Sequence, residues 1–190
     1  MQSKSHYQIV ISGVGGQGVL FITRLLAEAA IEKGLPVFTS ETHGMAQRGG
    51  TVISHLKVGE FASPLISPGQ ADGLIALKAE SLDQHGGYLK PGGWAAVNVP
   101  APLTMPAAAT PFYLDADRLA REMDNPRSVN LIMLGFTLSS AQRGGFGHGS
   151  LHCSLNDIEA VLENRLKGKT NRLQSSLRAL KAGADSTTAT

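Results

Sequence analysis

Two glycine-rich segments near the N-terminus hold the residues best suited to chemistry. The first is Gly13-Val-Gly-Gly-Gln-Gly18, which follows an apolar, β-branched run and precedes a pattern with helical periodicity. The second is Thr42-His-Gly-Met-Ala-Gln-Arg-Gly-Gly50. A strand, a tight glycine turn and a helix N-terminus together direct backbone N–H groups and the positive end of a helix at an anion. The first segment therefore predicts an anion site at the carboxyl end of a strand.

Each residue of the first segment has an expected role. Gly13 is expected to permit the turn, Gly15 to let a ligand or backbone approach closely, and Gly18 to let the helix lie against its strand. Gln17 can either reach a ligand with its amide or brace the second segment. These two roles stay open at this point.

The second segment adds a cation and an imidazole. Arg48, next to Gly49 and Gly50, is interpreted as an anion-binding guanidinium rather than a partner of Glu41 or a loop cap, because the glycines leave room for a ligand. His43 can carry a proton, contact a substrate or simply bond to backbone. Both segments follow strands that we predict to be neighbours in a parallel sheet, so that they share one crevice.

The spacing allows more than one class of ligand. Glu41 closes a predicted strand over 36–40, where a dinucleotide site places the acidic residue that binds a ribose. One hypothesis is therefore an NAD(P)-binding oxidoreductase. A Walker-type site is excluded, because the first segment lacks the Gly-Lys-Ser/Thr ending. A subunit with a purely structural role is a further alternative.

The pair of segments resembles the γ-type domain of the 2-oxoacid:ferredoxin oxidoreductases, and is most similar to the small β subunit of the indolepyruvate branch. The similarity includes Gly13–Gly18 and Ser40–Gly50, continues through Lys90-Pro-Gly-Gly93 and Asn130-Leu-Ile-Met-Leu-Gly135, and covers most of the chain. The pentapeptide Ala-Gln-Arg-Gly-Gly also recurs at 141–145. Its flanks do not match, and this second copy departs from the pattern of the family.

The resemblance implies a small subunit that is inactive alone. A large partner would hold thiamine diphosphate with magnesium and [4Fe-4S] clusters, decarboxylate a 2-oxoacid such as indolepyruvate or pyruvate, and pass electrons to ferredoxin. The acyl group would leave on coenzyme A. Phosphate or substrate contacts would come from the two segments, with candidate binding residues Gly13, Gly15, Gly16, Gln17, Gly18, Glu41, His43, Arg48, Gly49 and Gly50, and no metal ligand.

Composition narrows the remaining function classes. Of 190 residues, 42% are hydrophobic and 17% charged, with no apolar run long enough to cross a membrane. A net charge of +2 carries no nucleic-acid signature, and the polar N-terminus favours a cytoplasmic protein. Cys153 is the only cysteine, so the chain cannot hold an iron–sulfur cluster by itself. We interpret this thiol as a bystander.

The alternation of predicted strands and helices indicates an α/β fold. We expect one Rossmann-like three-layer domain over 1–182, with an open, mostly parallel sheet covered by helices on both faces, and a disordered tail over 183–190. Predicted strands include 51–58, 71–77, 94–99 and 112–114, and 90–93 is expected to form a turn. Ser154 and Asp157 predict a capping box, which opens a C-terminal helical pair.

Three features suggest surface contacts. The helix over 129–138 is apolar nearly all round, His55 is expected to be exposed or at an interface, and 139–152 is glycine-rich and expected to be mobile. From these we predict that the isolated chain forms a homodimer. Asn130, the polar residue in that helix, is expected to bond to neighbouring backbone rather than to act as a catalyst.

Overall fold

The computed structural model describes residues 6–43, 50–105, 109–144 and 151–187. Its strands are β1 (Tyr7–Val14), β2 (Val37–His43), β3 (Thr51–Val58), β4 (Ala71–Ala76), β5 (Leu89–Asn98) and β6 (Thr110–Leu114). Its α-helices are α1 (Val19–Glu32), α2 (Glu80–His85), α3 (Ala116–Glu122), α4 (Val129–Gln142), α5 (Leu155–Arg165) and α6 (Thr170–Ala184). Short 3₁₀ turns, η1 (Gly86–Tyr88) and η2 (Pro126–Ser128), precede β5 and α4.

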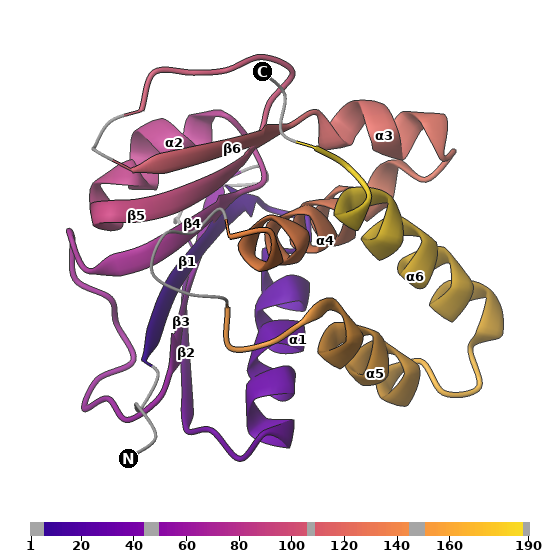
Figure 1. Cartoon of the computed structure of the whole chain (residues 1–190), viewed down its shortest axis with the longest axis horizontal. Coiled ribbons are helices and arrows are strands. Elements are labelled where there is room, and N and C mark those ends of the chain that lie inside the picture. The colour runs from indigo at the N-terminus through magenta and orange to yellow at the C-terminus, as the bar shows by residue number, and fades with distance from the viewer. Residues whose placement is uncertain (1–5, 44–49, 106–108, 145–150, 188–190) are drawn as a thin grey trace.

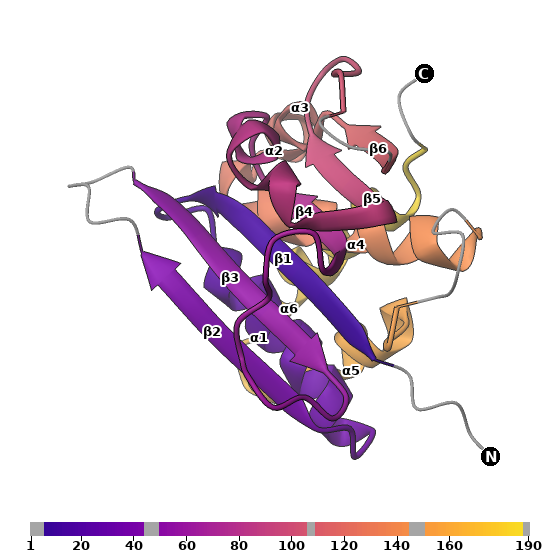
Figure 2. The same cartoon turned by 90° about the vertical axis from the view of Figure 1, so that its left-hand side faces the viewer.

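The strands form one six-stranded sheet in the order β2-β3-β1-β4-β5-β6 (Figures 1 and 2). β1, β4, β5 and β6 pair in parallel, whereas β3 pairs antiparallel to both β1 and β2. The expected mostly parallel α/β sheet is confirmed. The prediction that the strands before the two glycine segments are neighbours is wrong, because β3 lies between them. Since β3 reverses direction, β1 and β2 still end at the same edge of the sheet.

One face of the sheet carries most of the helices (Figure 1). α1 packs on β1, β2 and β3, while α4 packs on β4, β5 and β6. α1 buries the apolar residues that were predicted for one face of the helix, among them Val19, Ile22 and Leu26. A large hydrophobic core forms between these helices and the sheet, and α3, α5 and α6 enclose it. Because α1 packs in this helical layer, its N-terminus is held next to the C-terminal end of β1.

The opposite face is covered differently from the prediction. Among the described residues it carries one short helix, α2, together with the segment over 59–70, which crosses in front of the sheet in Figure 2. Ile66 of that segment enters a second apolar core with Val10, Ile53 and Leu74. The predicted half-exposed strand over 51–58 is therefore buried on both faces. His55, expected at the surface, is 3% exposed because the 59–70 segment covers it.

α4 is the central helix of the chain rather than a surface for a second copy. Nearly all of its residues are buried, and α6 packs along it. Gly135 and Gly183 let the two backbones meet: a Cβ at Gly135 would lie 1.9 Å from the Leu180 carbonyl oxygen. The apolar helix and His55 are thus buried within one chain, and they no longer support a homodimer. The homodimer stays a prediction.

Several predicted boundaries differ from the structure. The segment 90–93 belongs to β5 rather than to a turn, with Gly92 at a φ of 77°. α4 continues to Gln142, into the stretch expected to be a mobile loop, and 145–150 lie outside the described residues. α6 continues to Ala184, past the expected end of the domain, because Gly183 packs against Ile132 of α4. The predicted capping box of Ser154 and Asp157 is confirmed.

Candidate functional site

The first glycine segment forms a tight turn between β1 and α1. Gly16 and Gly18 have φ values of 91° and 81°, a left-handed conformation that favours glycine. Gly13 does not take the expected turn conformation. It is needed because a Cβ there would lie 2.7 Å from Oε1 of Gln17. Gly18 lies against Asn130 of α4 rather than against its own strand, and Asn130 Nδ2 donates to the Gly18 carbonyl oxygen at 3.4 Å. The expected backbone role of Asn130 is confirmed.

Gln17 braces the first segment from within. Its Oε1 accepts a hydrogen bond from the Val14 N–H at 2.8 Å, and its Nε2 donates to the Leu77 carbonyl oxygen at 3.3 Å. Both polar ends of the side chain are therefore bonded to backbone. The two alternatives from the sequence are replaced by a third, in which Gln17 ties the glycine turn to the end of β4.

The two glycine segments meet at the edge of the sheet. The Gly15 N–H donates to the Gly50 carbonyl oxygen at 3.1 Å, which joins the turn after β1 to the residue before β3. This contact is the close backbone approach that was expected at Gly15. His43 is the last residue of β2, and its side chain is not described. Arg48 and Gly49 lie outside the described residues.

A groove opens beside this junction. Its volume is about 470 Å³, within the range of small-molecule sites. Gly15, Gly16 and Gly18 contribute its glycine wall, and its apolar walls come from Val14, Val19, Leu20, Phe21 and Val52. Two arginines complete the lining: Arg24, which is exposed, and Arg165, which forms an ion pair with Glu28 and lies 5.9 Å from the centre of the Phe21 ring. Phe21, Arg24 and Arg165 are not among the site residues predicted from the sequence.

Glu41 does not lie where a dinucleotide site requires it. It pairs in register with Ser54, which in turn faces Ile11, so that Glu41 is level with the middle of β1 rather than with its end. Because β3 intervenes, β2 lies two strand spacings, about 10 Å, from β1. A ribose bound at the first glycine segment has its acidic partner at the end of the adjacent strand. The topology therefore removes the support for the NAD(P) hypothesis.

Polar side chains gather on the α2 side of the same edge. Ser12 Oγ and His85 Nδ1 lie 2.8 Å apart, and His55 Nδ1 accepts a hydrogen bond from the Ile66 N–H at 3.3 Å. Burial lowers the pKa of His55, and the charges of His85 and Lys57 lower it further. Burial also lowers the pKa of His85. Ser12 is fully buried, so this pair is structural rather than a nucleophile and its base.

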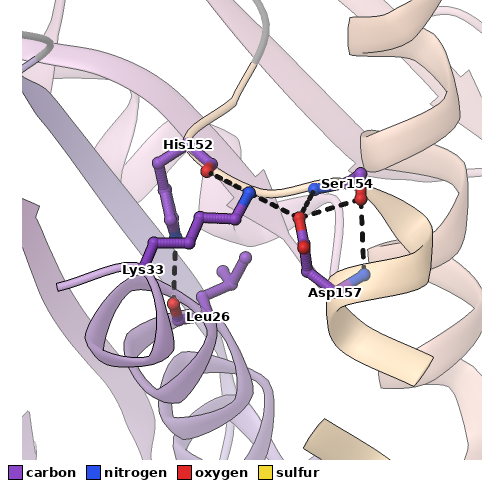
Figure 3. Close-up of polar contacts among 5 residues, drawn as sticks. All are labelled: Leu26, Lys33, His152, Ser154 and Asp157. Atoms are coloured by element: carbon purple, nitrogen blue, oxygen red, sulfur yellow. Dashed lines mark hydrogen bonds and ion pairs between the residues drawn. The ribbon is translucent and has the colours of Figure 1, made fainter. Parts of the chain in front are cut away.

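Cys153 is buried and lies in the chain between His152 and Ser154, whose polar contacts are drawn in Figure 3. The Lys33 ammonium donates to the His152 carbonyl oxygen at 3.0 Å and to Asp157 Oδ2 at 2.6 Å. His152 Nε2 donates to the Leu26 carbonyl oxygen at 2.9 Å. Burial raises the pKa of the Cys153 thiol to about 12, which disfavours the reactive thiolate. This agrees with its interpretation as a bystander.

Over 6–43, 50–105, 109–144 and 151–187, no group of three or more His, Cys, Asp or Glu side chains is placed to hold a metal ion. No helix in the same ranges is long and apolar enough to cross a membrane.

Comparison with known proteins identifies the family. The model of the pyruvate ferredoxin/flavodoxin oxidoreductase family matches residues 8–186, nearly the whole chain. This chain belongs to that family. Indolepyruvate oxidoreductase subunit IorB of Archaeoglobus fulgidus is 31% identical over 195 aligned positions, covering 92% of each chain. Relatives of this kind are small subunits of 2-oxoacid:ferredoxin oxidoreductases, so the chain is a small, γ-type oxidoreductase subunit.

Solved structures agree on the fold. Pyruvate oxidoreductase subunit PORC of Thermotoga maritima superposes with a TM-score of 0.75 at 22% identity, covering 96% of this chain and 97% of that one. A chain of the 2-oxoglutarate:ferredoxin oxidoreductase of Magnetococcus marinus, solved with 2-oxoglutarate, coenzyme A and succinyl-CoA bound, gives 0.76 at 24% identity. The alignment covers 95% of this chain and 31% of that longer chain.

The redox groups associated with this family do not fit the residues of this chain. A [4Fe-4S] cluster takes several cysteine thiolates, and the one cysteine is buried with a raised pKa. The sequence also lacks the Gly-Asp-Gly motif with a downstream Asn that binds magnesium and thiamine diphosphate. The described residues instead form a glycine turn at the N-terminus of α1, next to a groove. A glycine turn at a helix N-terminus is an arrangement that can bind a phosphate group.

Proposed function

We propose that this chain is the small subunit of an indolepyruvate-type 2-oxoacid:ferredoxin oxidoreductase. In this proposal a large partner subunit carries thiamine diphosphate and the [4Fe-4S] clusters, decarboxylates an aryl-2-oxoacid and reduces ferredoxin. The acyl group is transferred to coenzyme A. The branch is supported by the 31% identity to an indolepyruvate oxidoreductase subunit over 92% of both chains. The need for a partner is supported by the lack of cluster ligands in this chain.

The small subunit, in this proposal, binds the phosphate groups of coenzyme A at the junction of its two glycine segments. The observation that carries this proposal is the Gly15 to Gly50 hydrogen bond beside the groove. This contact supports the proposal because it brings Gly50 to the glycine turn that precedes the N-terminus of α1. A phosphate gains about 0.3–1 kcal/mol from a helix N-terminus. Such a gain is modest, so charged side chains must supply more.

Arg48 is the proposed charged contact from the second glycine segment. A hydrogen bond to a charged group contributes about 1.5–3 kcal/mol. The guanidinium also presents paired N–H donors that match a phosphate. The assignment of Arg48 rests on its sequence position beside Gly49 and Gly50. Glu41 and His43 stay candidate substrate contacts on the same ground.

The experiment is Arg48→Ala in the assembled complex of the small and large subunits. We expect KM for coenzyme A to rise about 10- to 100-fold, as the loss of a charge-assisted contact implies, with assembly intact. Arg143→Ala is the matched control, because Arg143 lies in the second Ala-Gln-Arg-Gly-Gly and donates to the carbonyl oxygens of Ala184 and Ser186. This control should leave KM unchanged.

The other outcomes favour different functions. If Arg48→Ala abolishes binding to the large subunit while the control assembles, Arg48 is an interface residue and the chain has a structural role. If KM for coenzyme A is unchanged in both variants, the proposed site is wrong. Tight NADH binding by the single chain would restore the dehydrogenase alternative.

A cytoplasmic location also stays a prediction.

A further inference from the structure

The backbone of Leu77, just past β4, joins the first glycine segment to the rest of the sheet. The Leu77 N–H donates to the Ser12 carbonyl oxygen at 2.8 Å. Its own carbonyl oxygen accepts two hydrogen bonds, from Gln17 Nε2 at 3.3 Å and from Asn98 Nδ2 at 3.1 Å. The two backbone polar groups of this one residue are therefore held by β1, by the glycine turn and by β5.

Asn98, the last residue of β5, is bonded through every part of its amide. Its Oδ1 accepts from the Ala116 N–H at 2.9 Å, and its Nδ2 donates both to Leu77 and to Asp117 Oδ2 at 2.8 Å. These partners fix the orientation of the amide, because a flipped group would aim its oxygen at two acceptors. The side chain is only 4% exposed. A buried amide whose oxygen and both N–H donors are bonded holds its neighbours in fixed places.

These bonds form one continuous path into the glycine turn. It runs from Asp117 on α3 through Asn98, the Leu77 carbonyl and the Gln17 amide to the Val14 N–H. Val14 is the last residue of β1 and lines the groove. The last hydrogen bond of this path, at the Val14 N–H, therefore holds the point where the backbone turns from β1 toward α1.

We propose that Asn98 is a positioning residue for the ligand site at the first glycine segment. It touches no ligand itself, because Leu77 and Gln17 lie between it and the turn. Its role is to hold the Leu77 carbonyl so that Gln17 keeps the turn in a geometry that presents N–H groups other than those of Val14, Gly15 and Gln17, which are bonded within the chain. The inference rests on the proposed function, in which those groups bind coenzyme A.

The test swaps the two side chains that form the Asn98–Asp117 hydrogen bond. In Asn98→Asp combined with Asp117→Asn, a carboxylate at 98 still accepts from the Ala116 N–H, and an amide at 117 donates to it. The Leu77 carbonyl loses its donor from β5. Asp117→Asn alone is the matched control, because an amide oxygen at 117 still accepts from Asn98 and the bond to Leu77 is kept.

Two readouts separate positioning from simple stability. One is the kcat and the KM for coenzyme A of the assembled complex. The other is amide hydrogen exchange of Val14 in the isolated full chain, which reports on the Gln17 brace without any ligand. For the exchanged pair we expect faster exchange at Val14, unchanged protection in β5, and a rise in KM of about 3- to 10-fold at constant kcat. The control should match the wild type in both.

Each other result has a defined meaning. Unchanged Val14 exchange in the exchanged pair overturns the positioning role, and an intact Arg48→Ala effect would then leave the proposed function standing. Faster exchange at Val14 with an unchanged KM for coenzyme A also overturns the positioning role, and this result counts against coenzyme A binding at this turn. If the exchanged pair does not fold, Gln17→Met is the second variant, which removes the next bonds of the path, from Gln17 to the Leu77 carbonyl oxygen and to the Val14 N–H. It must give faster exchange at Val14 and a rise in KM, or the proposal fails.

Discussion

At the scale of single residues, His152 shows how burial fixes a protonation state. Its Nε2–H donates to the Leu26 carbonyl oxygen, while its Nδ1 is buried without a partner in the described residues (Figure 3). Burial lowers its pKa, more than the Leu26 bond and Asp157 raise it, and the nearby Lys33 charge also lowers it. The side chain is therefore mainly neutral at pH 7 in the folded chain. Protonation would place a second positive charge beside Lys33.

This arrangement predicts that stability falls in mild acid. The folded pKa of His152 lies below the unfolded value of 6.5, so below pH 6.5 the unfolded chain binds more protons and the free energy of unfolding decreases. His55 and His85 act in the same direction. Urea unfolding at pH 7 and pH 5 should show that His152→Gln reduces the slope by up to about 1.4 kcal/mol per pH unit. An unchanged slope in this variant would mean that His152 is not held neutral.

The residues of the site differ in how far the sequence could place them. The Ser154–Asp157 capping box was predictable because its partners are three residues apart. Gln17 was not, since its partner Leu77 is sixty residues away and only the fold brings them together. The alternation of its strand predicted which face of the sheet His55 lies on. Its exposure to solvent depends on the 59–70 segment, which crosses over that face. Arg24 and Phe21 belong to a groove that only the packed α1 creates.

At the scale of elements, the close packing of α4 against α6 supports the first glycine segment. Asn130 at the start of α4 reaches the Gly18 carbonyl oxygen, so the position of α4 bears on the glycine turn. The crossing is close because each helix contributes a glycine. A Cβ at Gly183 would lie 1.8 Å from the Ile132 carbonyl oxygen, a contact with backbone that no rotamer change can relieve.

We therefore expect Gly135→Ala and Gly183→Ala to destabilise the chain by at least about 1–3 kcal/mol, although alanine is the better helix former. Denaturant unfolding monitored by circular dichroism measures this. Gly87→Ala is the control, because a Cβ there meets nothing within 4 Å. Wild-type stability in both helix variants would show that the helices separate at little cost.

The order of strands was the element-scale feature that the sequence could not provide. Alternating apolar runs placed the strands within a few residues, because burial on a sheet has a local signature. The insertion of β3 between β1 and β2 is a long-range pairing, of which the sequence gives no local trace. This one insertion separates Glu41 from the first glycine segment and changes which ligand the edge suits.

At the scale of the whole molecule, the proposed function requires that the redox groups lie on the partner subunit. We expect the purified single chain to contain no stoichiometric iron and to show no 2-oxoacid:acceptor activity, since one buried cysteine cannot hold a cluster. Metal analysis, a visible absorption spectrum and an assay with a ferredoxin-like acceptor test this. Stoichiometric iron with cluster absorbance in the single chain would contradict it.

In the proposed function, the junction of the glycine segments binds coenzyme A and not a nicotinamide dinucleotide. A nuclear magnetic resonance titration of the isotope-labelled chain with coenzyme A and, separately, with NADH tests this without the partner subunit. We expect saturable shifts with coenzyme A in the backbone amides of Gly15, Gly16, Gly18 and Gly50, and none there with NADH. Shifts confined to other parts of the chain, or saturable NADH shifts at these glycines, would contradict it.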